Sequence, residues 1–349
     1  MRKSLSIFAL LLGLATGCQS GGADPTPTPP TGPVLLDTGS VKVSAVATTV
    51  PVGVRDVYFA NDRAGVVATS DGKIYQTPDG GATWAQRYAG PAAAAQPLHQ
   101  VLFTAANVGY VVGGSLQCSG TGCVPAGGRI LKTTDGGASW ATVLQLPTAD
   151  IASIAVNDVG ELFAVANATD ARIYKSADEG STWAPVASAP YQLTKIAFDR
   201  AQGFCTSASG KIIKSTNRGA TWSEVATFGY PYLSELAVGP GIGFCVEGYG
   251  KVYRTTDGGA TWAQTGASQY SAQVVKVLTA ADCLILGAGR YSGGDFGTYN
   301  GSLRQTKDAG AHWTEAEVPS AGPIGCASFY TPTVGYAVAG TQLLSVQLY

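Results

Sequence analysis

RTTDGGATW, residues 254–262, is one of six copies of a nine-residue motif spread along the chain. The other copies are QTPDGGATW (76–84), KTTDGGASW (132–140), KSADEGSTW (175–183), KSTNRGATW (214–222) and QTKDAGAHW (305–313). All six tryptophans of the protein lie in these copies. A repeat of about 40 to 50 residues that contains several short apolar runs is typical of the blades of a β-propeller.

Each position of the motif favours a tight turn between two strands. The acid or amide side chain can accept hydrogen bonds from backbone N–H groups just ahead of it. The later glycine suits a positive φ, and the tryptophan supplies a large apolar group at the start of the next strand. The copies lack the alternating oxygen ligands of a calcium loop, so we predict a structural role and no metal or cofactor. The predicted structural pairs are Asp79 and Trp84, Asp135 and Trp140, Asp178 and Trp183, Asn217 and Trp222, Asp257 and Trp262, and Asp308 and Trp313.

Apolar runs upstream of the motif predict four strands per repeat, which we name A to D from the central channel outward. Strand A is expected at residues 54–59, 98–103, 151–156, 193–198, 233–238, 274–279 and 324–329. The seventh repeat ends after strand C, so residues 40–50 are expected to supply its strand D and close the ring. The sequence therefore predicts an all-β, seven-bladed β-propeller over residues 40–349, with six Asp-box motifs and an N-terminal closing strand.

The first 39 residues have the composition of an export signal and a tether. Arg2 and Lys3 precede an apolar stretch and then Leu-Ala-Thr-Gly-Cys, which is similar to a bacterial lipobox ending at Cys18. We predict a lipoprotein signal peptide over 1–18 with Cys18 lipidated, and a linker rich in Pro, Gly and Thr over 19–39. The predicted location is the bacterial cell envelope, on its periplasmic or outer surface, with the membrane contacted through the lipid alone. An ordinary cleaved signal peptide is the alternative.

Six further cysteines follow the anchor. Cys118 and Cys123 share one expected loop and are candidates for a disulfide. Cys205 and Cys245 occupy a position where other repeats have valine, so we expect them in the core, and we interpret Cys283 and Cys326 in the same way.

Composition argues against several functional classes. The formal net charge is −1 and only 13% of residues are charged, which gives no field that would attract nucleic acid. The only histidines are His99 and His312, and no nucleophile motif accompanies them, so no catalytic residue is predicted. A sialidase would need an arginine triad, and Arg129 instead belongs to a basic column repeated in other blades. Asp56 and Glu235 are the acids expected near the channel entrance, on well-separated blades.

The motif, together with GYVVGG at Gly109–Gly114, resembles the BNR or Asp-box propellers of the photosystem II stability and assembly factor type. The resemblance covers residues 54–349 and implies seven blades, frequent lipid anchoring and a non-catalytic role in assembling membrane protein complexes. Related repeats also occur in sialidases and other glycosidases. Carbohydrate binding or cleavage therefore stays open as the alternative function.

Partner binding is expected on the face that carries the D–A and B–C connections, which we call the top face. Long loops on a rigid scaffold often carry function, and two B–C connections are long, at residues 115–127 and 289–302. The expected partner of this monomeric protein is a protein or membrane protein complex at the envelope, or else a glycan. The candidate contact residues are Tyr191, Tyr230, Tyr232, Tyr249, Tyr270, Tyr291, Asp295, Phe296 and Tyr299.

Overall fold

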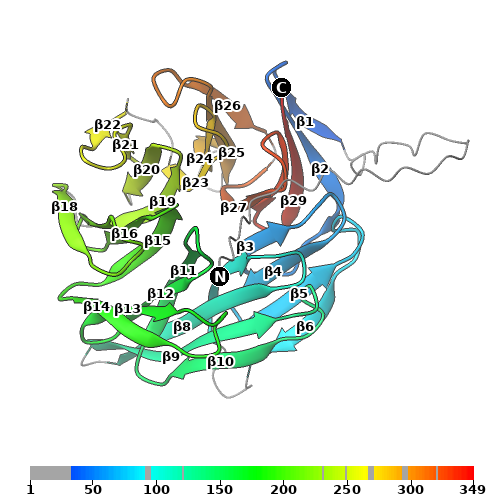
Figure 1. The fold of residues 1–349 in the computed structure, drawn as a ribbon. Helices are drawn as coiled ribbons and strands as arrows, with labels where there is room; N and C mark the ends of the chain where they lie inside the picture. Colours follow the sequence, from blue (N-terminus) through cyan, green and yellow to red (C-terminus); the bar gives the residue numbers. More distant parts are fainter. Residues whose placement is uncertain are drawn as a thin grey trace, which may run out of the picture.

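The computed structural model describes residues 33–90, 96–119, 122–229, 232–247, 250–265, 271–292, 298–319 and 321–349. Within these residues the secondary structure consists of strands, arranged as seven antiparallel sheets around a central channel (Figure 1). In the same ranges, no helix has the length and apolar character needed to cross a membrane. The predicted all-β, seven-bladed propeller is confirmed.

Six blades are meanders of four consecutive strands. Blades 1 and 2 are β3 (Val54–Phe59), β4 (Gly65–Thr69), β5 (Lys73–Thr77), β6 (Ala85–Ala89), and β7 (Leu98–Phe103), β8 (Gly109–Ser119), β9 (Gly122–Thr133), β10 (Ala141–Leu146). Blades 3 and 4 are β11 (Asp150–Val156), β12 (Leu162–Asn167), β13 (Ala171–Ser176), β14 (Ala184–Ala189), and β15 (Leu193–Asp199), β16 (Gln202–Ser207), β17 (Lys211–Ser215), β18 (Ser223–Thr227). Blades 5 and 6 are β19 (Leu233–Gly239), β20 (Ile242–Glu247), β21 (Val252–Thr255), β22 (Ala263–Gln264), and β23 (Ser271–Val277), β24 (Cys283–Ser292), β25 (Thr298–Thr306), β26 (Thr314–Val318).

Blade 7 combines the two ends of the chain. Its strands run from the channel outward in the order β27 (Ile324–Phe329), β28 (Val334–Ala339), β29 (Gln342–Leu348), β2 (Val41–Thr49) and β1 (Val34–Asp37). Strand β2 pairs with β29 in antiparallel register, for example Val43 with Val346, and so supplies the expected strand D. Strand β1 is an addition, because its residues fall within the predicted linker. The structured part of the chain therefore begins earlier than residue 40.

The Asp-box turns have the geometry that the sequence predicts, as the copy at 254–262 illustrates. Thr255 Oγ1 donates to Asp257 Oδ1 at 2.8 Å and accepts from the Gly259 N–H at 2.7 Å. Asp257 Oδ1 also accepts from the Thr261 N–H at 3.0 Å. Gly259 has a φ of +83°, and a Cβ there would lie 2.3 Å from the Phe204 ring. The turn therefore requires glycine for both conformation and space.

The hydrophobic core lies between neighbouring blades. One cluster joins Val57 and Phe59 of blade 1 to Tyr336 and Val338 of blade 7, across the point where the ring closes. Cys205, Cys245 and Cys283 are completely buried and Cys326 nearly so, which confirms their expected place in the interior. Packing between blades thus holds the innermost strands at fixed positions around the channel.

Candidate functional site

Each innermost strand carries a β-bulge near its start, and the residue after the bulge lines the channel. The register shifts lie between Val54 and Asp56 in blade 1 and at the equivalent point of every other blade. A bulge redirects the following side chain, and bulges are frequent next to functional sites. The seven residues after the bulges form what we call the post-bulge ring, made of Asp56, Gln100, Ser153, Lys195, Glu235, Val274 and Cys326.

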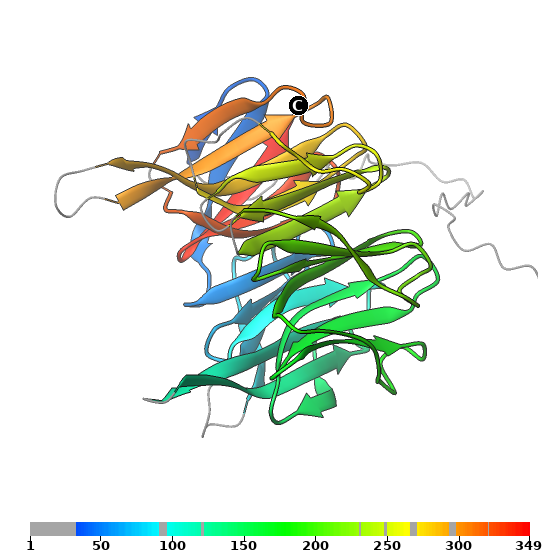
Figure 2. The same ribbon diagram turned by 90° about the vertical axis from the view of Figure 1, so that its left-hand side faces the viewer.

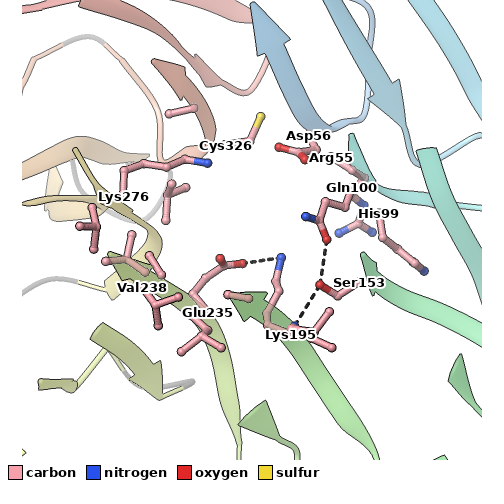
Figure 3. A pocket seen from close by; sticks show the side chains of 18 of the residues that line it. Arg55, Asp56, His99, Gln100, Ser153, Lys195, Glu235, Val238, Lys276 and Cys326 are labelled. Carbon is pink, nitrogen blue, oxygen red and sulfur yellow. Dashed lines mark hydrogen bonds and ion pairs between the residues drawn. The ribbon is translucent and has the colours of Figure 1, made fainter. Parts of the chain in front are cut away.

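A cavity of about 270 Å³ lies inside this ring (Figure 3). All seven ring residues line it, and so do Arg55, His99 and Lys276. The bulges lie where strand A leaves the D–A connection, so the ring is at the top-face end of the channel. The cavity is therefore a polar site shared by all seven blades.

Three ring residues connect neighbouring blades through backbone N–H groups. Asp56 Oδ2 accepts from the Val101 N–H at 2.9 Å, and Gln100 Oε1 accepts from the Ile154 N–H at 3.0 Å. Ser153 Oγ accepts from the Ile196 N–H at 3.2 Å. An innermost strand has one edge without a partner strand, and its N–H groups need acceptors when they are removed from water. These three side chains supply such acceptors and stabilise the contacts between blades 1 to 4.

The next two ring residues form an ion pair. Lys195 Nζ lies 2.9 Å from Glu235 Oε1, and both side chains are about three quarters buried (Figure 3). Burial alone would lower the pKa of Lys195, but the carboxylates of Glu235 and Asp56 outweigh it and the pKa is raised. Lys195 therefore remains a cation. The phenol of Tyr232 adds to this effect, which places the tyrosine near the ring.

The acids and histidine of the cavity have geometries that favour structural roles. Asp56 accepts two backbone N–H groups, from Val57 and Val101. His99 Nε2 lies 2.9 Å from Asp150 Oδ1, but the nearby Ser153 hydroxyl is fully buried and bonded to Gln100. A nucleophile needs a hydroxyl that a substrate can reach. Ser153, His99 and Asp150 thus lack the arrangement of a Ser-His-Asp triad.

The predicted aromatic contact residues separate into two groups. Tyr191 is partly buried, packs on the core between blades 3 and 4, and its ring contacts the Lys211 amine. Tyr232, Tyr291 and Tyr299 are about half exposed. The rings of Tyr291 and Tyr299 pack edge to face with centroids 5.2 Å apart. These three residues are the exposed ones among the described candidates, and we call them together the tyrosine surface.

The two long B–C connections are not loops, as we had expected, but extensions of strands. Strands β8 and β9 continue as a paired hairpin to Ser119 and Gly122, and β24 and β25 reach Ser292 and Thr298. Both hairpins project from the same side of the propeller (Figure 2). The reason is continued antiparallel pairing, with Tyr291 opposite Tyr299. The tyrosines therefore sit on paired strands.

Several predicted residues lie outside the described part of the chain. These are Cys18, Tyr230, Tyr249, Tyr270, Asp295 and Phe296. Cys118 and Cys123 are opposite each other in the backbone register of β8 and β9, and their side chains are outside the description. Among the described residues, no group of three or more His, Cys, Asp or Glu side chains could hold a metal ion.

The sequence analysis missed the post-bulge ring as a unit. It noted Asp56 and Glu235 as isolated acids on distant blades, whereas the structure places both on one cavity. The sequence did contain one signal. The third residue of the first five strands A is polar, at a position where a strand packed in the core is expected to have an apolar residue. The bulges that turn this column towards the channel leave no distinct residue signature, so the pattern alone could not reveal their direction.

Comparisons with known proteins agree with this architecture. A family model described as photosynthesis system II assembly factor YCF48 matches residues 38–189. A structure of YCF48 bound to a D1 peptide is similar, with 18% identity and a TM-score of 0.66, over 90% of this chain and 98% of that chain. YCF48 from Cyanidioschyzon merolae has 15% identity and a TM-score of 0.63, over 88% of this chain and 99% of that chain.

An enzyme is also among the similar structures. The Niastella koreensis GH74 enzyme has 15% identity and a TM-score of 0.64, and the match covers 87% of this chain but 53% of that chain. Identities this low show a common fold only. No curated protein sequence matches the chain significantly. The chain is a BNR-type β-propeller that resembles the photosystem II assembly factor family.

Proposed function

We propose that this protein is a non-catalytic envelope lipoprotein that binds a protein segment on its top face and acts as an assembly scaffold. The observation that carries the proposal is the tyrosine surface, since Tyr232, Tyr291 and Tyr299 are about half exposed and belong to the D–A and B–C connections of the top face. Tyrosines offer large, rigid and amphipathic contact areas, and they are enriched at the centres of protein interfaces. The position of Tyr291 and Tyr299 on paired strands lowers the entropy lost on binding.

The similar proteins support a protein partner. One of the YCF48 structures is bound to a D1 peptide, which is a protein segment. The resemblance to the assembly factor family favours the same class of ligand here. The export signal, lipidation at Cys18 and the location at the envelope belong to the same proposal and rest on the N-terminal sequence.

Glycan binding or cleavage is the second candidate, favoured by the GH74 match and by two acids on one cavity. A glycosidase needs one protonated carboxylic acid and one free carboxylate. Asp56 instead accepts two backbone N–H groups and Glu235 pairs with Lys195, so both carboxyl groups are engaged in contacts within the protein. We therefore rank binding without turnover first.

The test compares partner capture by two variants in solubilised envelope membranes. The triple variant Tyr232→Ala, Tyr291→Ala, Tyr299→Ala should lose at least tenfold in capture, because buried aromatic anchors contribute about 2 kcal/mol or more each. Tyr349→Ala is the matched control, since Tyr349 is equally exposed but follows strand C of blade 7, on the opposite face. Equal capture by the triple variant and the wild type, or turnover of β-glucans or sialosides by the pure protein, would reject the proposal.

A further inference from the structure

In each innermost strand, the residue that follows the post-bulge ring residue has a backbone N–H group that points away from the partner strand. In blades 1 to 4 these N–H groups belong to Val57, Val101, Ile154 and Ile196, and each donates to a side-chain oxygen. The equivalent residues in blades 5 to 7 are Leu236, Val275 and Ala327, which have the same register. Since pairing alternates along an antiparallel strand, their N–H groups point the same way.

Blades 5 to 7 have no such side-chain acceptor among the described residues, because the ring residues that would supply it are of other chemical types. Lys195 is a hydrogen-bond donor, Glu235 is paired with Lys195, and Val274 is apolar. Within the described ranges, no side-chain oxygen accepts from the N–H of Leu236, Val275 or Ala327. All three residues line the channel cavity. Backbone N–H groups that line a cavity and have no side-chain acceptor are available to a ligand that accepts hydrogen bonds.

A positive charge lies on the same wall. Lys276 comes from β23, and Figure 3 shows its amine directed into the cavity on the side of Cys326. Its amine has no ion-pair partner among the described residues. Among the Lys, Arg, Asp and Glu residues that line the cavity, Arg55, Lys195 and Lys276 outnumber Asp56 and Glu235 by one positive charge. The wall thus combines aligned N–H donors with a free cation, as anion sites do.

We propose that the wall formed by Leu236, Val275, Ala327 and Lys276 is a subsite for a single carboxylate group. Lys276 and the N–H groups of the wall within its reach would hold the two carboxylate oxygens, while Asp56 and Glu235 in the same cavity would repel a dianion such as phosphate. A cavity of about 270 Å³ fits a carboxylate on a short stem. The inference goes beyond the proposed function, because the carboxylate can belong to a free acid or to a side chain of a bound peptide.

The test uses the full chain labelled with ¹⁵N at alanine, leucine and valine, and follows amide shifts by NMR. The probes are N-acetylglycine, its uncharged analogue N-acetylglycinamide, inorganic phosphate, and the peptide acetyl-Ala-Glu-Ala-amide, all at one ionic strength. The amides of Leu236, Val275 and Ala327 should shift with the two carboxylates and stay unchanged with the other probes. Tighter binding of the peptide assigns the carboxylate to a partner segment, and tighter binding of N-acetylglycine assigns it to a free acid.

Two variants test the wall itself. Lys276→Met should weaken carboxylate binding at least tenfold, as loss of a charge-assisted hydrogen bond predicts. Val274→Thr places a hydroxyl where Ser153 stands in blade 3, so it should occupy the Ala327 N–H and weaken binding severalfold. Lys73→Met, which removes a lysine paired with Asp71 outside the cavity, is the control and should bind normally. Unshifted amides, equal shifts with phosphate, or full affinity in Lys276→Met would overturn the proposal.

Discussion

The carboxylates of the Asp-boxes are held as anions by the turns that they close. Hydrogen bonds from the Ser139 hydroxyl and N–H lower the pKa of Asp135 to about 2, and equivalent bonds from Thr182 lower that of Asp178 to about 2. The fourth copy has Asn217, whose Oδ1 accepts from the Thr221 N–H at 2.9 Å as an aspartate would. The motif therefore needs a hydrogen-bond acceptor at this position of the turn. The negative charge of an aspartate there makes the stability of the protein depend on pH.

This dependence can be tested by exchanging acid and amide. A carboxylate whose pKa is lowered on folding stabilises the protein above its unfolded pKa of about 3.9 and loses that effect as the pH falls towards 2. The double variant Asp135→Asn, Asp178→Asn should keep the fold, and its Tm should fall less between pH 6 and pH 2.5 than that of the wild type. The measurement is thermal unfolding followed by circular dichroism. Asn217→Asp is the reciprocal control and should make the fall steeper; equal pH profiles for all three would contradict the explanation.

Strands were predictable where a single residue pattern, such as an apolar run between turn residues, marked the strand. The innermost strand 324–329 was predicted with the bounds that β27 has, because turn residues flank an apolar run. Strand β1 was missed, since a single apolar run in a segment rich in Pro, Thr and Gly has no visible partner in the sequence. The two long hairpins were taken for loops because their glycines and polar residues hide the pairing between β8 and β9 and between β24 and β25.

Strands β1 and β2 should contribute very differently to stability. Strand β2 pairs with β29 and buries Val41 and Val43, which are 3% and 0% exposed, whereas β1 is a short edge strand whose Val34 is half exposed. Each fully buried valine contributes about 1.5–3 kcal/mol. Deleting residues 33–38 should lower the Tm slightly, and deleting 33–49 should remove cooperative unfolding, because β29 then becomes an open edge. Scanning calorimetry of both deletions measures this; equal effects would show that β2 does not close the ring.

The whole molecule separates a face that carries the Asp-box turns from a face on which we propose recognition. The Asp-boxes and the A–B turns lie on the bottom face, while the channel cavity, the tyrosine surface and both hairpins lie towards the top. The sequence predicted this division, because the order of strands fixes which connections share a face. It could not predict that ring residues from seven distant segments would share one cavity, since their spatial proximity depends on the bulges and on ring closure.

The proposed membrane attachment concerns the whole molecule and rests on its first residues. If Cys18 carries the lipid, the propeller is held near the envelope membrane through residues 19–32 and β1, and no other part needs to enter the bilayer. We expect the wild type to partition into the detergent phase of a Triton X-114 separation and Cys18→Ala to move to the aqueous phase, because acyl chains supply about 0.8 kcal/mol per buried CH₂. Cys118→Ala is the control and should stay with the detergent. Aqueous wild-type protein would instead favour an ordinary cleaved signal peptide, and detergent-phase Cys18→Ala would point to another membrane contact.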